Sequence, residues 1–302
     1  MDSAKGAASH KTVMRTEIRN SIFAETMSIA RSLLRTCGHA TSRRMSAASH
    51  PSAVRCIAST AGETPVYVVF GASGGVGSEL IRLLSASGNV FAVGRDEAKL
   101  AKLSGPRVTT HVADATAPGG ADAAIAAAVA AHGTVHGVAN CIGSVLLKAA
   151  HTTSDAELAT IMTTNLGSSF SILRASVKTM KAGGSIVLCS SAVARHGLAN
   201  HEAIAAAKGA VAALMLSAAA TYAPQNIRVN CVSPGLTRTP MTARITGNEA
   251  ALKAGTEMHA LKRIGEPGDI ARAMAFLLDP QNAFITGQNV GVDGGLSSLR
   301  PK

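Results

Sequence analysis

A glycine-rich turn is the first segment of the chain whose composition suggests chemistry. It follows the apolar run Val66–Phe70 and reads Gly71-Ala72-Ser73-Gly74-Gly75-Val76-Gly77, ahead of a helical stretch. Glycines allow a tight turn and a close approach of the backbone to a ligand. The free N–H groups and the dipole at the start of the following helix favour a pyrophosphate. The candidate contact residues are Gly71, Ser73, Gly75, Val76 and Gly77.

Further polar and glycine-containing segments follow in order along the chain. They are Val112-Ala113-Asp114-Ala115, Ala139-Asn140-Cys141-Ile142-Gly143, Thr164-Asn165-Leu166, Ser190-Ser191, Ile227-Arg228-Val229-Asn230, Pro234-Gly235 with Thr239, Ile285-Thr286-Gly287-Gln288 and Val292-Asp293-Gly294-Gly295. Together with the G-x-x-x-G-x-G spacing of the turn, these segments resemble the short-chain dehydrogenase/reductase family. The resemblance runs from residue 66 to residue 296.

The resemblance implies that one set of these residues binds a nicotinamide cofactor and that another acts in catalysis. Beyond the turn, the implied cofactor contacts are Arg95, Asp114, Ala115, Asn140, Gly143, Lys208, Pro234, Gly235 and Thr239. Asp114 would lie at the adenine ring and Thr239 at the nicotinamide amide. In the catalytic set, Asn165 would anchor a water of the proton relay, Ser191 would be the catalytic serine, and Lys208 would hold the nicotinamide ribose.

The chain departs from the family at the proton donor. The family places a Tyr four residues before the Lys, in the pattern Y-x-x-x-K, but Ile204 stands four residues before Lys208. The spacing from Ser191 supports Ile204 as the equivalent position, and Tyr222 lies well downstream. His201 lies three residues before Ile204 on the same helix face, and histidine titrates near neutral pH. His201 is therefore a candidate substitute acid, unless it only caps or hydrates the start of the helix.

Three functions remain open on this pattern. The favoured one is an oxidoreductase that acts on a carbonyl or alcohol substrate with a substitute proton donor, either His201 or a bound water. The second is a cofactor-binding sensor or assembly protein without catalysis. The third is a non-redox elimination or isomerisation on the same scaffold. The presence of Ser191, Asn165 and Lys208 favours the first.

The cofactor preference is predicted from the end of the second apolar run, Val93-Gly94-Arg95-Asp96. Dinucleotide-binding proteins specific for NAD usually carry an acid here that binds the ribose hydroxyls, and Gly94 occupies that position. A guanidinium pairs well with phosphate oxygens, and Arg95 is the next residue. The sequence therefore predicts NADP(H), with NAD(H) as the alternative.

An alternating pattern of elements must bring these residues together. Apolar runs of strand length alternate with helical stretches, which predicts a single doubly wound Rossmann-type α/β domain with a parallel seven-stranded sheet. In such a sheet the carboxyl ends of the strands share one edge, where ligands bind. The predicted strands are Val66–Phe70, Asn89–Val93, Arg107–Val112, His136–Asn140, Ser185–Cys189, Ile227–Val232 and Asn289–Val292. The predicted helices are Gly75–Ser87, Asp96–Leu103, Ala121–Ala131, Asp155–Met180, Ala203–Tyr222 and Pro267–Leu278.

Composition excludes several other partners. Aromatic residues make up 3% of the 302 residues, too few for a single-stranded nucleic-acid platform. The net charge is +11, but residues 1–60 hold nine Lys/Arg against three Asp/Glu, so more than half of the excess lies there. No nucleic-acid partner is therefore expected. The five cysteines are odd in number and lack C-x-x-C spacing, so neither a disulfide framework nor a metal site is expected.

Residues 1–61 are Arg-rich, Ser-rich and poor in acids after Glu25, which is typical of an organellar transit peptide ahead of a domain at residues 62–302. The segment Ala53–Ala58 favours a plastid, with the mitochondrion as the alternative. The apolar stretch Ala203–Ala223 contains Lys208, which favours a packed helix over membrane insertion. Its small residues are compatible with a homodimer or homotetramer, as the resemblance implies. The segment Met241–Lys262 is expected to select the substrate.

Overall fold

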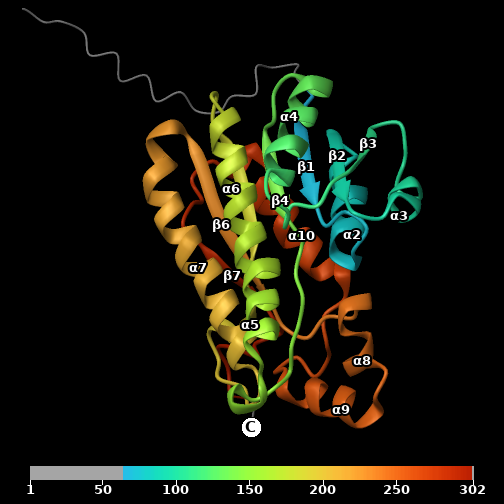
Figure 1. Ribbon diagram of the computed structural model, residues 1–302, viewed down its shortest axis with the longest axis vertical. Helices are drawn as coiled ribbons and strands as arrows, with labels where there is room; N and C mark the ends of the chain where they lie inside the picture. The colour runs from blue at the N-terminus through green and yellow to red at the C-terminus, as the bar shows by residue number, and fades with distance from the viewer. Residues whose placement is uncertain (1–63, 301–302) are drawn as a thin grey trace, which may run out of the picture. The chain divides into compact units, whose positions relative to one another are not determined.

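A parallel sheet of seven strands lies at the centre of the chain in this computed structural model, which describes residues 64–300. The strand order is β3-β2-β1-β4-β5-β6-β7 (Figure 1). The strands are β1 Val66–Phe70, β2 Asn89–Gly94, β3 Val108–Val112, β4 Gly137–Asn140, β5 Gly184–Cys189, β6 Ile227–Pro234 and β7 Asn289–Val292. The predicted doubly wound α/β fold is confirmed. The predicted transit peptide, residues 1–61, lies outside the described residues.

The central strands are continuously apolar because helices cover both of their faces. All five residues of β1 are buried, whereas none of β3, at one edge, is fully buried. β1 lies between β2 and β4, so that Val68 is paired with both Phe91 and Val138. The strand order reverses between β1 and β4. The carboxyl ends of these two strands therefore form the switch point where folds of this kind bind ligands.

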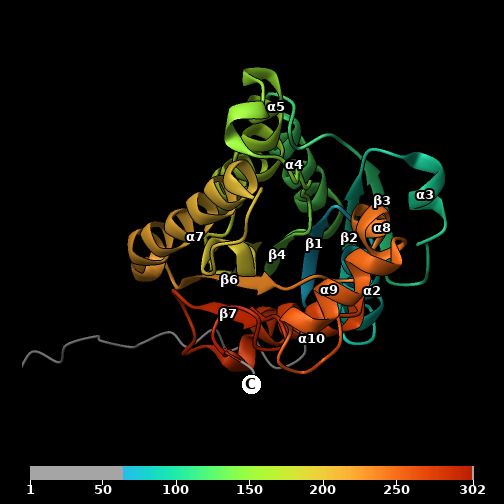
Figure 2. The same ribbon diagram turned by 90° about the horizontal axis from the view of Figure 1, so that it is seen from below.

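Helices form a layer on each side of the sheet (Figure 2). On one side, α4 (Gly120–His132), α6 (Ser168–Thr179) and α7 (Glu202–Tyr222) share a buried cluster with the strand side chains. On the other side, α2 (Gly75–Leu84), α3 (Glu97–Ala101) and α10 (Pro267–Leu278) contribute to a second cluster. Each strand end is thus held between two packed layers.

The predicted helix Asp155–Met180 is present but contains a π-helical turn. α5 spans Asp155–Met162, the π turn spans Thr163–Gly167, and α6 follows directly. The side-chain amide of Asn165 donates to the carbonyl of Ile161 at 2.9 Å. Because this amide satisfies an α-helical carbonyl, the backbone can widen at this point. Helical periodicity carries no mark of such a turn, so a continuous helix was predicted.

α7 is long enough and apolar enough to cross a membrane by length and composition alone, with a mean hydropathy of 1.7 over its best window. Core helices of globular proteins pass the same test. Eight residues of α7 are buried, among them Val211 and Met215, which pack into the cluster against the sheet. α7 is therefore a packed helix of the fold in this structure.

Two short helices occupy the segment that was predicted to select the substrate. α8 (Ala243–Thr246) and α9 (Glu249–Met258) lie between β6 and α10. The side chain of Asn248 accepts from the backbone N–H of Ala251 at 2.9 Å and so caps α9. The sequence predicted a loop and helix here without bounds.

Candidate active site

The glycine-rich turn lies at the switch point and requires glycine at two places. Gly71 has a φ of +73°, and a Cβ there would lie 2.8 Å from the carbonyl carbon of Cys141, at the end of the neighbouring strand. A Cβ on Gly77 would collide with the carbonyl oxygen of Gly71. The chain therefore passes close under the start of α2, which begins at Gly75. The first N–H groups of α2 face the edge where a pyrophosphate would bind.

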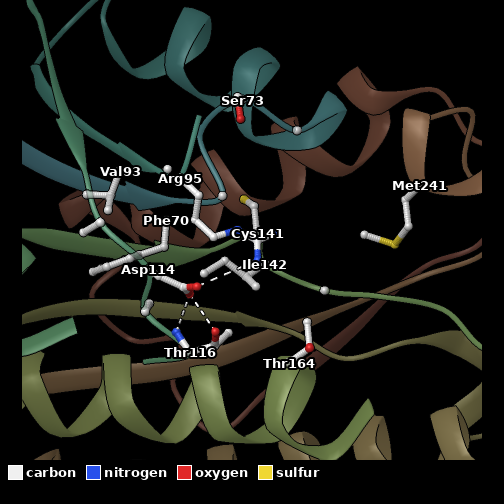
Figure 3. Close-up of a pocket in the computed structure, with 16 residues that line it drawn as sticks. Phe70, Ser73, Val93, Arg95, Asp114, Thr116, Cys141, Ile142, Thr164 and Met241 are labelled. Carbon is white, nitrogen blue, oxygen red and sulfur yellow. Dashed lines mark hydrogen bonds and ion pairs between the residues drawn. The ribbon is translucent and has the colours of Figure 1, made fainter. Parts of the chain in front are cut away.

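A cavity of about 200 Å³ lies beside this turn (Figure 3). It is bounded by the carboxyl ends of β1 and β2 and by the segments after β3 and β4. Its walls include the predicted cofactor residues Gly71, Ser73, Arg95, Asp114, Ala115 and Gly143, together with Gly94, Thr116, Ile142 and Met241. The glycine-rich turn leaves room for a ligand close to the backbone, and the charged side chains of Arg95 and Asp114 lie at one end of the cavity. Together these features fit the adenosine half of a dinucleotide.

Arg95 and Asp114 form the charged end of this cavity. A nitrogen of the Arg95 guanidinium lies 3.8 Å from the Asp114 carboxylate, and the Arg95 side chain is 75% exposed. The hydroxyl and backbone N–H of Thr116 donate to Asp114 at 2.6 and 2.9 Å. The Thr116 hydrogen bonds, and to a smaller extent Arg95, lower the pKa of Asp114. Asp114 is thus held by Thr116, while most of the Arg95 guanidinium is available to a ligand.

A second cavity, of about 400 Å³, continues from the first and shares Cys141, Ile142, Gly143 and Met241 with it. It contains most of the predicted catalytic and nicotinamide-binding residues, namely Val76, Ser191, His201, Ile204, Lys208, Pro234, Gly235 and Thr239. Most of its remaining wall is apolar and comes from Val145, Leu147, Leu198, Leu236, Ile245, Ala251, Ala254 and Met258.

Lys208 lies at the base of the second cavity. It is 7% exposed, and its ammonium donates to the carbonyl of Cys189 at 2.8 Å. A Cβ on Gly143 would lie 3.4 Å from this ammonium and 3.2 Å from Oδ1 of Asn165. The absence of a side chain at Gly143 therefore leaves the space in front of the lysine open.

Asn165 is fully buried behind Gly143 and does not line either cavity. Its Oδ1 accepts from the backbone N–H of Ser144 at 3.2 Å, and its amide donates to the Ser144 hydroxyl at 3.0 Å. The π turn directs this side chain at the loop after β4. Asn165 therefore fixes the loop that joins the two cavities.

Asn140 plays a similar positioning part. It is 1% exposed, its amide donates to the hydroxyl of Ser169 at 3.0 Å, and its oxygen accepts from the backbone N–H of Ile142 at 2.9 Å. It thus ties the end of β4 to α6. Ser191 follows β5, where its hydroxyl accepts from the N–H of Val193 at 3.4 Å.

Ile204, which the sequence pattern matches to the family's Tyr, is packed among apolar side chains. It is 3% exposed and forms a buried cluster with Ile161, Ala203 and Ala207. Leu146, Met162 and Val193 pack against this cluster. The residue still forms part of the cavity wall, so the reaction centre has a hydrocarbon surface where a hydroxyl would stand.

His201 precedes α7 and also lines the second cavity. Its Nδ1 lies 2.7 Å from the carbonyl oxygen of Ala199. A carbonyl only accepts, so Nδ1 carries the proton in this contact and Nε2 is left to face other groups. The side chain makes no capping hydrogen bond to α7, although capping was one interpretation of the sequence.

His259 and Thr242 were not singled out in the sequence. His259 follows α9, is 1% exposed, and has its Nδ1 2.6 Å from the carbonyl oxygen of Gly255. Its Nε2 lacks a hydrogen-bond partner among residues 64–300 and lies against Gly235. Thr242 accepts from the N–H of Thr239 at 3.1 Å. The Thr242 contact is local, whereas the placement of His259 against Gly235 depends on how α8 and α9 fold back, which residue spacing does not show.

No group of three or more His, Cys, Asp or Glu side chains within residues 64–300 is arranged to hold a metal ion. The polar groups that line the second cavity include Lys208, Ser191, His201 and Thr239.

The fold and the joined cavities define an α/β dinucleotide-binding protein, and comparisons with known proteins give its family. Residues 71–297 match the family described as enoyl-(acyl carrier protein) reductase. A short-chain type dehydrogenase/reductase from Mycobacterium ulcerans superposes with a TM-score of 0.75 at 30% identity, over 78% of this chain and 91% of that one. The chain belongs to the short-chain dehydrogenase/reductase family, a family of oxidoreductases.

Two relatives with named activities or locations are also similar. A galactitol 2-dehydrogenase (L-tagatose-forming) of Cereibacter sphaeroides is 31% identical over 239 residues, which is 75% of this chain and 92% of that protein. A chloroplastic tropinone reductase homolog of Arabidopsis thaliana is 33% identical over 160 residues. The match covers 52% of this chain and spans 50% of that relative's length.

Proposed function

We propose that this chain is an NADP(H)-dependent oxidoreductase that interconverts a carbonyl and an alcohol. The observation that carries the proposal is the continuity of the two cavities through Cys141, Ile142 and Gly143. One part adjoins the phosphate-binding turn, and the other contains Ser191 and Lys208. A dinucleotide laid along this edge would present its nicotinamide, which accepts or donates hydride, to the apolar part of the site.

The preference for NADP(H) rests on Arg95. Its guanidinium is largely exposed at the first cavity, which fits the adenosine half of the cofactor. Gly94, the preceding residue, offers no carboxylate to the ribose hydroxyls. A bidentate pair between guanidinium and phosphate is among the stronger hydrogen-bonded pairs in proteins. The Asp114 carboxylate at 3.8 Å helps to orient the guanidinium.

The catalytic residues act without the family's Tyr. Ser191 is placed to hydrogen-bond the substrate oxygen, and Lys208 to hold the nicotinamide ribose and keep positive charge near the oxygen that becomes an alkoxide. Asn165 fixes the loop at Gly143. The proton then comes from a water beside Ser191 and Lys208 or from Nε2 of His201.

We favour the water as the proton source. Side chains on a helix lean toward its N-terminus, which carries His201 away from Ile204. The hydrogen bond from His201 to Ala199 holds the ring in that direction. Isoleucine is smaller than tyrosine, and the cavity beside it is large enough for a water with polar partners.

The wall of the second cavity supports an apolar substrate. Among its side chains are Leu147, Leu236 and Met258, and within residues 64–300 no Phe, Tyr or Trp lines it. A polyol such as the substrate named for the galactitol dehydrogenase relative would leave several hydroxyls without partners there. We therefore propose a lipophilic, activated carbonyl compound, such as a quinone or an α-diketone, which needs less acid assistance than a simple ketone.

The test is a pair of measurements on purified protein. Titration calorimetry should show NADPH binding, and NADPH absorbance should fall slowly when menadione or 1-phenyl-1,2-propanedione is added. Xylitol or galactitol with NADP+ should give no signal above background. If NADPH fails to bind, the proposed function is wrong.

A second function, a cofactor-binding sensor or assembly protein, is favoured by one observation. Ile204 is buried in an apolar cluster at the reaction centre, and this cluster contains no proton donor. Tight NADPH binding, combined with no turnover of any carbonyl in the panel by the natural chain or by Ile204→Tyr, would support this function.

We also propose import into a plastid and assembly into a homodimer or homotetramer. The composition of residues 1–61 and the chloroplastic relative support the location. Exposed Phe170 on α6 and Leu216 on α7, at 50% and 58% exposure, support association through this face. Light scattering after size exclusion should give two or four times the monomer mass.

A further inference from the structure

Two cysteines lie at matching positions on neighbouring strands at the junction of the two cavities. The pairing of β4 with β5 matches Ala139 to Val187. Two residues further along each strand, the same register matches Cys141 to Cys189. Both cysteines line the second cavity and both are free and partly buried.

The two thiols share one face of the sheet. Residues two apart on a strand point to the same side, and Ala139 and Val187 belong to the cluster beneath α2 and α10. Cys141 and Cys189 pack against that same cluster. Cys231 is fully buried in the cluster on the opposite side, where it cannot meet them.

The spacing suits a disulfide. Neighbouring strands lie about 4.8 Å apart, and disulfide-bonded Cα atoms lie about 4.4–6.8 Å apart. The hydrogen-bonded pairing of β4 with β5 ends at Ala139 and Val187, so the cysteines lie beyond the last fixed pair. No β4–β5 hydrogen bond therefore fixes the separation of the two cysteines, although each is still bonded to its other neighbour, Cys141 to Phe70 and Cys189 to β6.

The two thiols differ in their surroundings. Burial, and to a smaller extent the neighbouring Cys189, raise the pKa of the Cys141 thiol, whose sulfur lies 3.9 Å from the sulfur of Met274. Cys189 has its own carbonyl bonded to the Lys208 ammonium at 2.8 Å. Both thiols line the second cavity, and since the sulfur of Met274 packs against Cys141, we take Cys189 as the thiol that meets a small oxidant first.

We propose that Cys141 and Cys189 form a redox-sensitive thiol pair that a peroxide converts into a disulfide at the floor of the cofactor site. The Cys189 thiolate attacks hydrogen peroxide, breaking its O–O bond and giving a sulfenic acid and, with a proton, water. The Cys141 thiol then displaces the sulfenic oxygen as a second water, and the S–S bond forms. In total, two thiols and one hydrogen peroxide give one disulfide and two waters.

The disulfide would alter the part of the site that holds the cofactor. The backbone N–H of Cys141 donates to the carbonyl of Phe70 at 2.9 Å, and the Cys141 carbonyl lies against Gly71. A shift of Cys141 toward β5 disturbs this contact, and a shift of Cys189 disturbs its hydrogen bond with Lys208. The disulfide should therefore weaken NADPH binding at least tenfold. This effect rests on the proposed function, whereas the formation of the disulfide is independent of it.

The experiment uses the full chain carrying Cys37→Ser and Cys56→Ser, which removes the two cysteines outside residues 64–300. The reduced protein is treated with a small excess of hydrogen peroxide and then with iodoacetamide. Before alkylation the intact mass should fall by two hydrogens, and after alkylation peptide mapping should join the peptides of Cys141 and Cys189. NADPH affinity by titration should fall at least tenfold and recover fully with dithiothreitol.

Three variants control the result. Cys141→Ala and Cys189→Ala should each abolish both the mass change and the oxidative loss of affinity, relative to the same variant reduced. Cys231→Ala should keep both. A stable sulfinic acid at Cys189, a disulfide to Cys231, or alkylation of both Cys141 and Cys189 after peroxide treatment of the Cys37→Ser, Cys56→Ser chain would each overturn the proposal. Linkage without any NADPH binding in the reduced protein would leave the thiol pair in place and refute the proposed function instead.

Discussion

Ile204 gives the active site a surface that cannot donate a proton. A positioned general acid contributes about 10²–10⁴-fold to a proton-transfer step. The loss of the hydroxyl therefore dominates the chemistry of the site, although Ser191 and Lys208 remain in place. Ile204 lines the second cavity, so a tyrosine at this position would have open space beside it.

We expect Ile204→Tyr to raise the rate of carbonyl reduction, by about 10²-fold for simple ketones, because the hydroxyl supplies the missing acid. The tyrosine ring is larger than the isoleucine side chain and fills part of the cavity, so a smaller gain in rate is expected for quinones. Single-turnover oxidation of NADPH measures the effect. Ile204→Phe is the matched control, since it adds the ring without the hydroxyl and should give no gain. An equal gain from both variants would contradict the explanation.

His201→Ala distinguishes the two proton sources. If water is the donor, the rate should change less than about threefold, whereas loss of a general acid lowers it about 10²-fold or more. The pH dependence of the single-turnover rate provides a second readout. An inflection present in the natural chain and absent from the variant would assign the proton to His201.

Arg95→Ala tests the cofactor preference. We expect the natural chain to bind NADPH at least tenfold tighter than NADH, about 1.4 kcal/mol, and the variant to bind the two equally. Calorimetric titration with both cofactors measures this ratio. Arg107→Ala is a suitable control, because Arg107 bonds to the carbonyl of Ala86 away from the cavity. An unchanged ratio of NADPH to NADH affinity in Arg95→Ala would show that another group binds the 2′-phosphate.

Among the elements, α5 has an N-terminus that is capped by side chains and reinforced by an ion pair. Ser154 and Glu157 form a capping box, in which the Ser154 hydroxyl accepts from the N–H of Glu157 at 3.3 Å and the Glu157 carboxylate accepts from the N–H of Ser154 at 2.8 Å. The ammonium of Lys148 donates to both carboxylate oxygens. These contacts anchor the start of the helix that continues into the π turn and Asn165.

The pH dependence of stability should report this cap. The hydrogen bonds from Lys148 and then from Ser154 lower the pKa of Glu157 from 4.5 to about 2. The folded pKa is below the unfolded one, so the stabilisation is complete above about pH 4.5 and is lost as the pH falls toward 2. The difference in Tm between the natural chain and Glu157→Gln should be largest at pH 7 and shrink between pH 4.5 and pH 3.

Differential scanning calorimetry at pH 7, 5, 4 and 3 measures this difference. Glu249→Gln in the first turn of α9 is the control, since within residues 64–300 Glu249 forms no ion pair. A Tm difference for Glu157→Gln that stays constant over this range would contradict the predicted role of the carboxylate.

The elements also show where sequence patterns are informative. β1, β7 and α10 begin and end at the predicted residues, because apolar runs bounded by Gly, Pro or Asn mark both ends. The π turn was missed because it changes backbone pairing without changing the period of buried residues over a long stretch. The fold-back of α8 and α9, which places His259 against Gly235, was missed because it depends on contacts between distant segments.

For the whole molecule, the ordered sequence of motifs predicted the fold and gathered most of the candidate site residues around two joined cavities. Gly75, Gly77, Asn140 and Asn165 are the exceptions, and the two asparagines lie behind the walls and hold loops in place. A list of matching residues cannot separate contact from support, because both depend on the direction of a side chain after packing.

The first core strand begins at Val66, so we expect a chain that starts at Gly62 to fold like the full chain. Its Tm and its NADPH affinity should agree with those of the full protein within error. A full-length fluorescent fusion should enter plastids and yield a mature N-terminus between Arg44 and Glu63 by mass spectrometry. A fusion that lacks residues 1–61 should stay outside the organelle. A full-length protein recovered with an intact N-terminus would contradict the prediction.

The strand order also determines when each part of the sheet can form during synthesis of the chain. β1 cannot complete its strand pairing until β4 has been synthesised, because Val68 is paired with Val138 seventy residues later in the chain. Until then, β1 to β3 form a small sheet with one open edge, and Gly71 lacks the Cys141 backbone against which it packs. Pairings between distant segments form slowly and leave strand edges exposed while they wait. A nascent chain on the ribosome should therefore need protection of this edge by a chaperone, and should first retain its nucleotide only after synthesis has passed Thr239.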